Sequence, residues 1–415
     1  MPLQQQLQAF WSAPTDRYQG SVAPEFLELA QLFSRLQAMR TQQGGAALCI
    51  YLNKEKVLDV YTGWQSSDHV WQKDTMALSY STGKGVLATL AHALVSAGII
   101  EYDRPIAEYW PEFAAQGKHD ITLRHALSHQ TGLYDLRSLI GDAKEMLDWP
   151  HMLAVMAQAA PQFAAGTQAA YQALSFGWIV GGALEKASQR SLAELMWTYL
   201  QQPLRLEDSY FGVPEPHLAR VARPILPIEP IATAPKSPDV LTRVFGQYQQ
   251  WRGYRMQDVQ AAMSPRGMRH WSWYADESLR VPIPAANGVF SAENLARIYA
   301  MLAQHGTWRG EQIIRPEVLG LASKIQYRQR DRVMPFAMHW RLGYHRICSL
   351  GKSVKEAYGH MGYNGSMAWC DPKRQLSLGY VHNFPTGSMQ GDYRMLLLNQ
   401  TALRCADRMR KNRQR

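Results

Sequence analysis

The chain of 415 residues is 46% hydrophobic and 19% charged, a composition typical of a globular protein with a large core. It contains no run of eighteen apolar residues, so no membrane-spanning helix is predicted. The net charge of +10 comes in part from the basic segment 408–415, which we interpret as a solvated terminus and not as a nucleic-acid site. A P-loop and a G-x-G-x-x-G sequence are both missing, and we predict no cofactor.

The four cysteines, Cys49, Cys348, Cys370 and Cys405, are widely spaced and form no C-x-x-C pair. Residues 1–6 contain neither the basic nor the apolar region of a signal peptide. Both observations favour a cytoplasmic protein whose thiols are free. Nothing in the sequence predicts the oligomeric state.

The first part of the chain predicts a helix and then a hairpin. Apolar residues recur at helical spacing from Phe26 to Leu36, which indicates an amphipathic helix over residues 24–40. Two short apolar runs, 46–52 and 56–62, flank a polar turn and predict two antiparallel strands.

Ser81 and Lys84 form an S-x-x-K sequence directly before an apolar helical pattern that ends at Gly98. Residues three apart share one face of a helix, so the hydroxyl and the amine can touch. A serine at a helix N-terminus also meets unpaired N–H groups and the positive end of the helix dipole, which stabilise an alkoxide. The pattern therefore predicts a nucleophile with its proton acceptor.

A plainer interpretation of the same residues makes Ser81 a helix-capping residue and Lys84 a solvated side chain of the first turn. A second S-x-x-K, at Ser349 and Lys352, is followed by no amphipathic helix. An S-x-x-K sequence therefore also occurs by chance. Other parts of the sequence are needed to choose between the catalytic and the capping interpretation of Ser81.

The next segments predict structure more than chemistry. Two prolines make 101–112 irregular, and 122–133 predicts a short helix that ends at a glycine. His125 and His129 share one face of that helix, but the zinc-protease pattern requires a Glu where Ala126 stands. We interpret both histidines as structural and predict no metal site.

The central third of the chain combines buried helices with a long loop. Residues 174–186 predict a buried helix, and 291–302 a helix capped by Ser291. Five prolines between 222 and 240 predict an extended loop that forms a lid or pocket wall. Residues 241–280 are rich in Trp, Tyr and Met, which form core or line an apolar substrate pocket.

The chain ends in strands again. Residues 359–363, 366–370 and 375–382 predict consecutive antiparallel strands, and 392–410 a final helix.

This order predicts an α+β fold, with an antiparallel sheet flanked by the N- and C-terminal helices. We assign 1–75 and 300–415 to the sheet domain and 76–299 to an inserted, mostly helical domain. The active site is expected between the two.

Taken together, these stretches resemble the serine β-lactamase and penicillin-binding-protein superfamily, and within it the class C branch and the family VIII carboxylesterases. The resemblance covers nearly the full chain. The stretches that carry it, in chain order, are Ser81-Thr82-Gly83-Lys84, Trp110-Pro111-Glu112-Phe113, Gly117-Lys118, residues 121–129, Asn287-Gly288, Leu295-Ala296-Arg297 and Gly359-His360-Met361-Gly362.

The resemblance implies that Ser81 is the acylated nucleophile, that Lys84 is its proton partner, and that Tyr171 is the tyrosine of the family's second motif. The residue two positions after that tyrosine is usually Asn or Ser, whereas this chain has Ala173. The sequence leaves open whether Lys84 or Tyr171 takes the serine proton. Either group needs a lowered pKa, and we expect Lys84 to lower the pKa of Tyr171.

The Lys-Thr-Gly strand of penicillin-binding enzymes appears here as His360-Met361-Gly362. The resemblance implies that this strand completes an oxyanion hole from the N–H groups of Ser81 and Tyr363. A His at position 360 is mostly neutral at pH 7, whereas penicillin-recognising relatives hold the substrate carboxylate with a cation there.

The sequence therefore predicts a serine carboxylesterase that cleaves short-chain or small acyl esters through an acyl-enzyme on Ser81. A β-lactamase, a DD-peptidase or an acyltransferase of the same fold are the alternatives, and a non-catalytic scaffold is less favoured. An α/β-hydrolase is unsupported because the chain has no G-x-S-x-G sequence.

Overall fold

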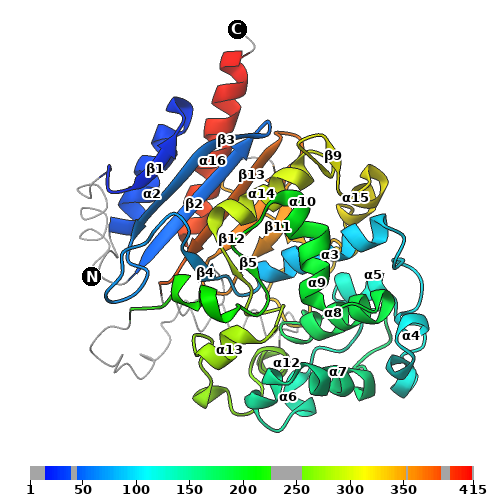
Figure 1. Ribbon diagram of the computed structural model, residues 1–415. Helices are drawn as coiled ribbons and strands as arrows, with labels where there is room; N and C mark the ends of the chain where they lie inside the picture. Colours follow the sequence, from blue (N-terminus) through cyan, green and yellow to red (C-terminus); the bar gives the residue numbers. More distant parts are fainter. Residues whose placement is uncertain (1–14, 39–43, 226–254, 352–353, 385–392, 414–415) are drawn as a thin grey trace.

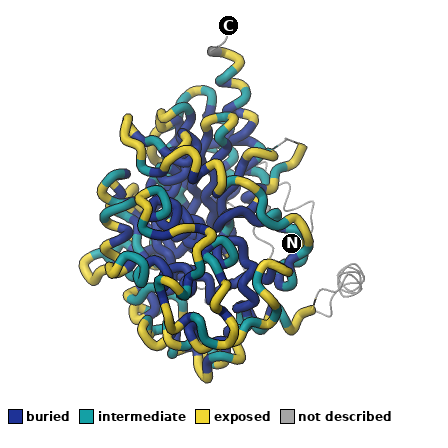
Figure 2. Tube along the Cα trace, turned by 90° about the vertical axis from the view of Figure 1, so that its right-hand side faces the viewer, coloured by how far each residue is buried: buried dark blue, intermediate teal, exposed yellow. Residues whose placement is uncertain are grey.

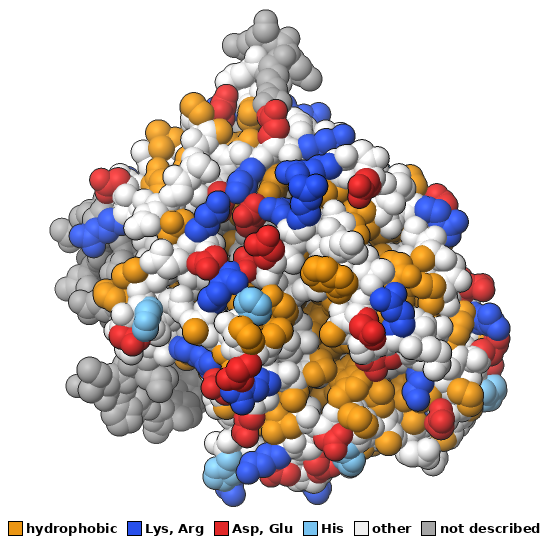
Figure 3. Space-filling model, in the orientation of Figure 1, with side chains coloured by type: hydrophobic (Ala, Val, Ile, Leu, Met, Phe, Trp, Pro, Cys, Tyr) orange, Lys and Arg blue, Asp and Glu red, His pale blue; other side chains and the backbone are white. Residues whose placement is uncertain are grey.

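The computed structural model describes residues 15–38, 44–225, 255–351, 354–384 and 393–413. Within these ranges no helix is long and apolar enough to cross a membrane. On the face drawn in Figure 3, Lys and Arg side chains are interspersed with Asp and Glu side chains and form no continuous basic surface.

A seven-stranded antiparallel sheet combines both ends of the chain (Figure 1). Its order across the sheet is β1 (Gln19–Val22), β3 (Glu55–Gly63), β2 (Gly45–Leu52), β13 (Leu376–His382), β12 (Met367–Asp371), β11 (Tyr358–Met361) and β10 (His345–Arg346). The central pair joins the two ends, with Leu48 opposite Tyr380. This confirms the predicted α+β fold with a sheet built from both ends.

Helices cover both faces of this sheet. Helices α2 (Leu27–Ala38) and α16 (Tyr393–Arg413) pack against one face, and α14 (Ala292–Ala303) packs against the other (Figure 1). Strand β2 shows the two-residue alternation of a strand: Leu48 belongs to the core under α2 and α16, and Cys49 to the core on the opposite side. Figure 2 shows the resulting buried centre of the molecule.

The remaining elements lie mostly in the helical part of the chain. The α-helices are α3 (Thr82–Ser96), α4 (Ile106–Tyr109), α5 (Leu123–Leu127), α6 (Leu136–Leu139), α7 (Trp149–Gln158), α8 (Ser175–Ser188), α9 (Leu192–Met196), α10 (Gln202–Leu204), α12 (Met256–Met263), α13 (Asp276–Arg280) and α15 (Pro316–Ala322). The other helical segments are η1 (Pro24–Phe26), η2 (Pro111–Gly117), η3 (Ala143–Leu147), η4 (Trp197–Gln201), η5 (Glu215–Arg220) and η6 (Met268–His270). The short strands are β4 (Met76–Leu78), β5 (Ser209–Tyr210), β6 (Val221–Ala222), β7 (Val289–Phe290), β8 (Thr307–Trp308) and β9 (Glu311–Gln312).

Helix α3 is the centre of this part of the molecule. It packs against α8 and against strand β11 of the large sheet. All thirteen residues from Thr82 to Leu94 are buried, as expected for a helix that is surrounded by the core on all sides. The helix therefore lies where the sheet and the helical part meet.

Most predicted elements are confirmed, and two predictions are wrong. The helix predicted over 122–133 ends at Leu127, because Ser128 leaves helical geometry and His129 takes a left-handed conformation with φ 61°. The segment 101–112 is not irregular throughout, since α4 forms one helical turn there.

Two further predictions, the division into domains and the role of the proline-rich loop, stay predictions. Helix α14 crosses the predicted domain boundary at residue 300 and packs on β13, and the division into domains stays a prediction. The proline-rich loop lies outside the described residues from residue 226 onward.

Candidate active site

Ser81 is placed by a tight connection between β4 and α3. The chain leaves β4 and turns at Tyr80, whose left-handed φ of 47° is a strained conformation for a non-glycine residue. Ser81 follows at the first turn of α3 and caps the helix with no side-chain hydrogen bond. The hydroxyl therefore takes no part in capping the helix, although Ser81 stands at the N-cap position, and the plainer interpretation does not explain it.

Lys84 is buried with no exposed surface, and its Nζ lies 3.1 Å from Ser81 Oγ. The same amine donates hydrogen bonds of 2.7 Å to the carbonyl oxygens of Ala173 and Ala285. Burial holds the pKa of Lys84 well below its ordinary value of 10.5, and no carboxylate pairs with it among the described residues. Lys84 is therefore not the solvated side chain of the plainer interpretation.

These contacts define what the amine can do. A neutral amine has two N–H groups and one lone pair. The carbonyls of Ala173 and Ala285 take both N–H groups, so the lone pair is directed at the third neighbour, the hydroxyl of Ser81. The amine donates to Ser81 Oγ while it is protonated, and once it is neutral the hydroxyl donates to the amine, which is the geometry for transfer of the serine proton.

Tyr171 precedes α8 and lies beside the same pair. Its ring lies 4.8 Å from Lys84 Nζ and stacks on Trp340 with centroids 5.5 Å apart at 7°. Burial raises the pKa of Tyr171 by more than its hydrogen bond with Ser81 lowers it. The expectation that Lys84 lowers this pKa is wrong: burial and the carboxylate of Asp331 raise the pKa of Tyr171, and Ser81 is the group that lowers it.

The edge of strand β11 approaches the start of α3 closely. A Cβ atom at Gly362 would lie 2.4 Å from the carbonyl oxygen of Ser79, so only glycine fits there. Thr82 Oγ1 reinforces the contact by donating to the carbonyl of Ser366 at 3.1 Å. Among the described residues, the backbone N–H groups of Ser81 and Tyr363 donate to no protein group.

His360 is buried and neutral. Its Nδ1–H donates to the carbonyl of Met361 at 3.0 Å, and its ring lies 4.7 Å from that of His345. Burial holds the pKa of His360 well below 6.5, and the neighbouring histidine and Lys84 act in the same direction. No permanent cation therefore occupies the position of the family's lysine.

Ser81 and Tyr171 line one cleft together with His360, Gly362 and Tyr363. All the predicted site residues except Lys84 thus reach this cleft, and Lys84 reaches it through Ser81. The residues of its wall that sequence reasoning missed are Met334, Phe336, Met338, Trp340, His345, Arg346 and Met395. Their only sequence signal is an excess of Met and aromatic residues, which does not distinguish a pocket from a core.

A second hollow of about 890 Å³ also opens onto Ser81 and Tyr171. Met263, Met268 and Trp273 line it. The described part of 241–280 therefore contributes to an apolar pocket, one of the two roles expected for it. Ser81 lies where the two hollows meet.

Two histidines that a metal site would use have other partners. His125 belongs to the cap of α5, where its Nδ1 accepts from the N–H of Thr122 at 3.2 Å. His129 accepts from the N–H of Gln172 at 3.2 Å, and its ring lies 5.0 Å from that of Tyr171. Residues 121–129 therefore have a structural role next to Tyr171.

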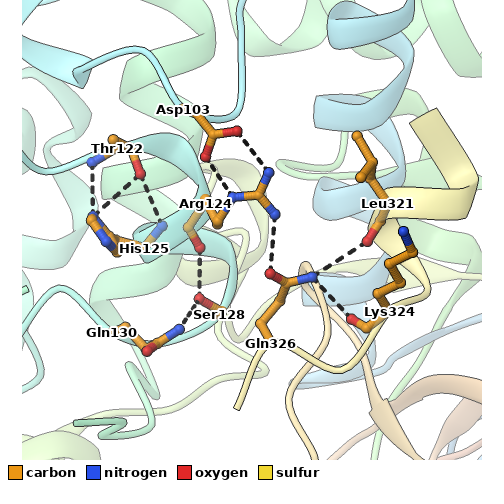
Figure 4. A network of polar contacts seen from close by, with 9 residues as sticks. All are labelled: Asp103, Thr122, Arg124, His125, Ser128, Gln130, Leu321, Lys324 and Gln326. Atoms are coloured by element: carbon orange, nitrogen blue, oxygen red, sulfur yellow. Dashed lines mark hydrogen bonds and ion pairs between the residues drawn. The ribbon is translucent and has the colours of Figure 1, made fainter. Parts of the chain in front are cut away.

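Figure 4 shows how this support is anchored. Arg124 pairs with Asp103 and donates to Gln326 Oε1 at 3.0 Å. The backbone N–H of Gln326 in turn donates to the carbonyl of Trp340 at 2.7 Å. The network ties α5 to the wall of the cleft that stacks on Tyr171.

The second S-x-x-K has no comparable setting. Ser349 lies outside any helix and donates to Gln400 Oε1 at 2.8 Å. Lys352 lies outside the described residues.

Comparison with known proteins shows the family to which the chain belongs. The family model described as Beta-lactamase matches residues 29–402. The esterase/β-lactamase LipL of Mycobacterium tuberculosis is 32% identical over 368 residues, which span 88% of this chain and 82% of LipL.

Two solved structures are similar over 94% of this chain and 99% of their own length, each with 29% identity. One is a family VIII carboxylesterase, with a TM-score of 0.81, and the other a penicillin-binding protein homologue from Caulobacter crescentus, with a TM-score of 0.78. The chain belongs to the β-lactamase family and is a serine hydrolase of the β-lactamase-like superfamily.

Proposed function

We propose that the protein is a carboxylesterase that cleaves short-chain or small acyl esters through an acyl-enzyme on Ser81. One observation carries this proposal: a buried amine, Lys84, lies 3.1 Å from the hydroxyl of Ser81 with its other hydrogen-bonding positions occupied. Ser81 is partly exposed at the floor of the cleft and is therefore open to a ligand.

In the first half of the reaction, Ser81 Oγ attacks the ester carbonyl carbon and its proton passes to the neutral amine of Lys84. The carbonyl oxygen becomes an oxyanion, which accepts from the unpaired N–H groups of Ser81 and Tyr363. Each such donor contributes roughly 3–4 kcal/mol to the stability of the transition state. We assign the base role to Lys84, because its pKa is lowered while that of Tyr171 is raised.

Collapse of the tetrahedral intermediate breaks the bond to the leaving alcohol, which needs a proton. The neutral phenol of Tyr171 is hydrogen-bonded with Ser81 and has a proton to donate on that side. The proton that Lys84 took from Ser81 replaces the one that Tyr171 gives to the alcohol, so the leaving group departs as a neutral alcohol and Tyr171 ends as a neutral phenol. Water then attacks the acyl-enzyme by the reverse sequence and releases the acid.

The cleft favours a neutral substrate. His360 is uncharged, and the walls on both sides of Ser81 are formed mostly by methionine and aromatic side chains. Arg346 is the single Lys or Arg among the described residues of the first hollow, and it lies exposed at its rim. A carboxylate close to the reacting carbonyl would lose its hydration without gaining a partner.

The proposal is tested with p-nitrophenyl butyrate and a chromogenic cephalosporin, each given to the protein and to Ser81→Ala. We expect turnover of the ester to exceed that of the cephalosporin and to fall to the uncatalysed rate in Ser81→Ala. Labelling by a fluorophosphonate, read as a mass shift, should likewise require Ser81.

Three results would contradict the proposal. Ester turnover that survives in Ser81→Ala rejects the nucleophile. Cephalosporin turnover faster than ester turnover assigns the protein to the β-lactamases. Absence of both turnover and labelling favours a scaffold without catalysis.

A further inference from the structure

A buried carboxylate that the proposed reaction does not use lies behind the cleft. Asp331 has no exposed surface, and its Oδ1 accepts from the backbone N–H groups of Val333 at 2.8 Å, Met334 at 2.9 Å and Tyr171 at 3.1 Å. Its Oδ2 accepts from the indole N–H of Trp340 at 2.8 Å. One side chain thus joins three segments of the chain.

Among the described residues, only these four N–H groups compensate the carboxylate of Asp331 for its loss of hydration. It forms no ion pair within the described part of the chain, although Arg332 is close in sequence and pairs with Asp258 instead. Burial raises the pKa of Asp331 from 3.8 to about 6, which means that the charged form is costly in this place. A buried carboxylate without a nearby cation does little to stabilise a fold, so stability alone does not explain Asp331.

Two of the four contacts hold the two members of the aromatic stack beside Ser81. Asp331 holds Tyr171 by its backbone and Trp340 by its ring, and the two rings stack at 7° with centroids 5.5 Å apart. The face of the Tyr171 ring lies 4.8 Å from Lys84 Nζ. Displacement of either anchor therefore moves the phenol relative to Ser81 and Lys84.

We propose that Asp331 is a positioning residue for Tyr171, whose carboxylate fixes the phenol against the Ser81 and Lys84 pair. This inference depends on the proposed function, in which Tyr171 exchanges a proton with the leaving group. Asp331 touches neither substrate nor reacting atoms and acts through Tyr171 and Trp340. By holding Met334, it also fixes a residue of the cleft wall.

Asp331→Asn is the sharpest change, because it keeps the shape of the side chain. The amide has one acceptor oxygen and one donor nitrogen, whereas every neighbour of Asp331 is a donor. In either orientation the amide nitrogen faces an N–H group, so at least one anchor is lost. We expect kcat for p-nitrophenyl butyrate to fall about tenfold to thirtyfold, with a change in KM below about threefold.

A double-mutant cycle with Tyr171→Phe separates positioning from general damage. Tyr171→Phe keeps the ring and removes the hydroxyl. If Asp331 acts through that hydroxyl, Asp331→Asn changes kcat less than about twofold in the Tyr171→Phe background. Trp340→Phe removes a single donor, and it should give a smaller loss of about threefold that vanishes in the same background.

Asp371→Asn is the matched control. Asp371 is also buried, at 1% exposed, but it pairs with Arg374 at the far end of strand β12 from Met367. Loss of this carboxylate should lower stability and leave kcat within about twofold. Circular dichroism establishes that each variant is folded, and Trp340→Phe preserves the test if Asp331→Asn does not fold.

Two results would overturn the inference, and they have different consequences for the proposed function. If Tyr171→Phe lowers kcat and Asp331→Asn lowers it by the same factor in both backgrounds, the role of Asp331 is rejected while the proposed function stands. If Tyr171→Phe leaves kcat unchanged, the proposed role of Tyr171 fails and the inference fails with it.

Discussion

The two sides of the site are built in opposite ways. Ser81 and Lys84 lie three residues apart on the first turn of α3, so the helix itself sets their 3.1 Å contact. On the other side, Tyr171 is anchored by Asp331, which lies 160 residues away in sequence and has no regular element in common with it. The first side is local, and the second exists only after the chain has folded.

This difference has a physical consequence. The local pair depends on helix geometry and on burial, which lowers the pKa of the amine. The distant side depends on one carboxylate that must meet the backbone of Tyr171 and the ring of Trp340 at the same time. We therefore expect changes on the local side to remove the chemistry, and changes on the distant side to weaken it by degrees.

The largest effect should come from Lys84→Met, which removes the proton acceptor and keeps an unbranched side chain. We expect kcat/KM for p-nitrophenyl butyrate to fall about a thousandfold, the usual size of a general-base contribution. Initial rates at fixed enzyme concentration measure this loss.

Lys118→Met is the control for Lys84→Met. Lys118 is also fully buried, and its amine donates to the carbonyls of Ala115, Ala157 and Ala159. Its loss should lower the melting temperature as much as that of Lys84 but leave kcat/KM nearly unchanged. Equal losses of activity in both variants would show that the effect of Lys84 is structural.

The second prediction concerns stability on the distant side. Burial raises the pKa of Asp331 from 3.8 to about 6, so between these pH values the folded protein keeps a proton that the unfolded chain has released. The contribution of Asp331 to the free energy of unfolding is therefore present below about pH 4 and is lost as the pH rises through about 6. The shift corresponds to about 3 kcal/mol at most.

Urea unfolding of the protein and of Asp331→Asn at about pH 4 and about pH 7 measures this term. Groups common to both proteins cancel in the difference between them. The free energy of unfolding of the protein relative to the variant should fall between the two pH values. A relative rise would contradict the raised pKa of Asp331.

The third prediction is the pH profile of the local side. Lys84 accepts a proton only when neutral, and its pKa lies well below 10.5. Activity should therefore be lost as the pH falls through this lowered pKa, and kcat/KM should reach its plateau at a pH well below the ordinary lysine pKa of 10.5. After subtraction of the Ser81→Ala rate, a tenfold rise per pH unit up to about pH 10 would indicate a lysine with an ordinary pKa.

The smallest effect should come from His360→Lys, which adds a charge to the strand side of the cleft. We expect the affinity for an anionic β-lactam to increase by about fivefold, a gain limited by the burial that already lowers the pKa of His360. Inhibition of ester turnover by the β-lactam measures it. KM for the neutral ester serves as the control. An unchanged inhibition constant would contradict the proposal that the missing charge at position 360 disfavours anionic substrates.

The sequence by itself determined the local features. The spacing of Ser81 and Lys84, the apolar run of α3, the short apolar runs of β2 and β3 and the strand segments of β12 and β13 predict their elements, because each depends on neighbours a few residues away. The family resemblance then extended the prediction to Tyr171, His360 and the edge of β11.

Only the tertiary structure decided which charges the site contains and what surrounds it. The burial that lowers the pKa values of Lys84 and His360, the burial that raises the pKa of Tyr171, and the contact of Asp331 with the N–H of Tyr171 all come from segments distant in sequence. Desolvation depends on the atoms that fill the space around a group, and no pattern along the chain records them. The same reason explains why the methionine and aromatic wall of the cleft was visible in the sequence only as composition.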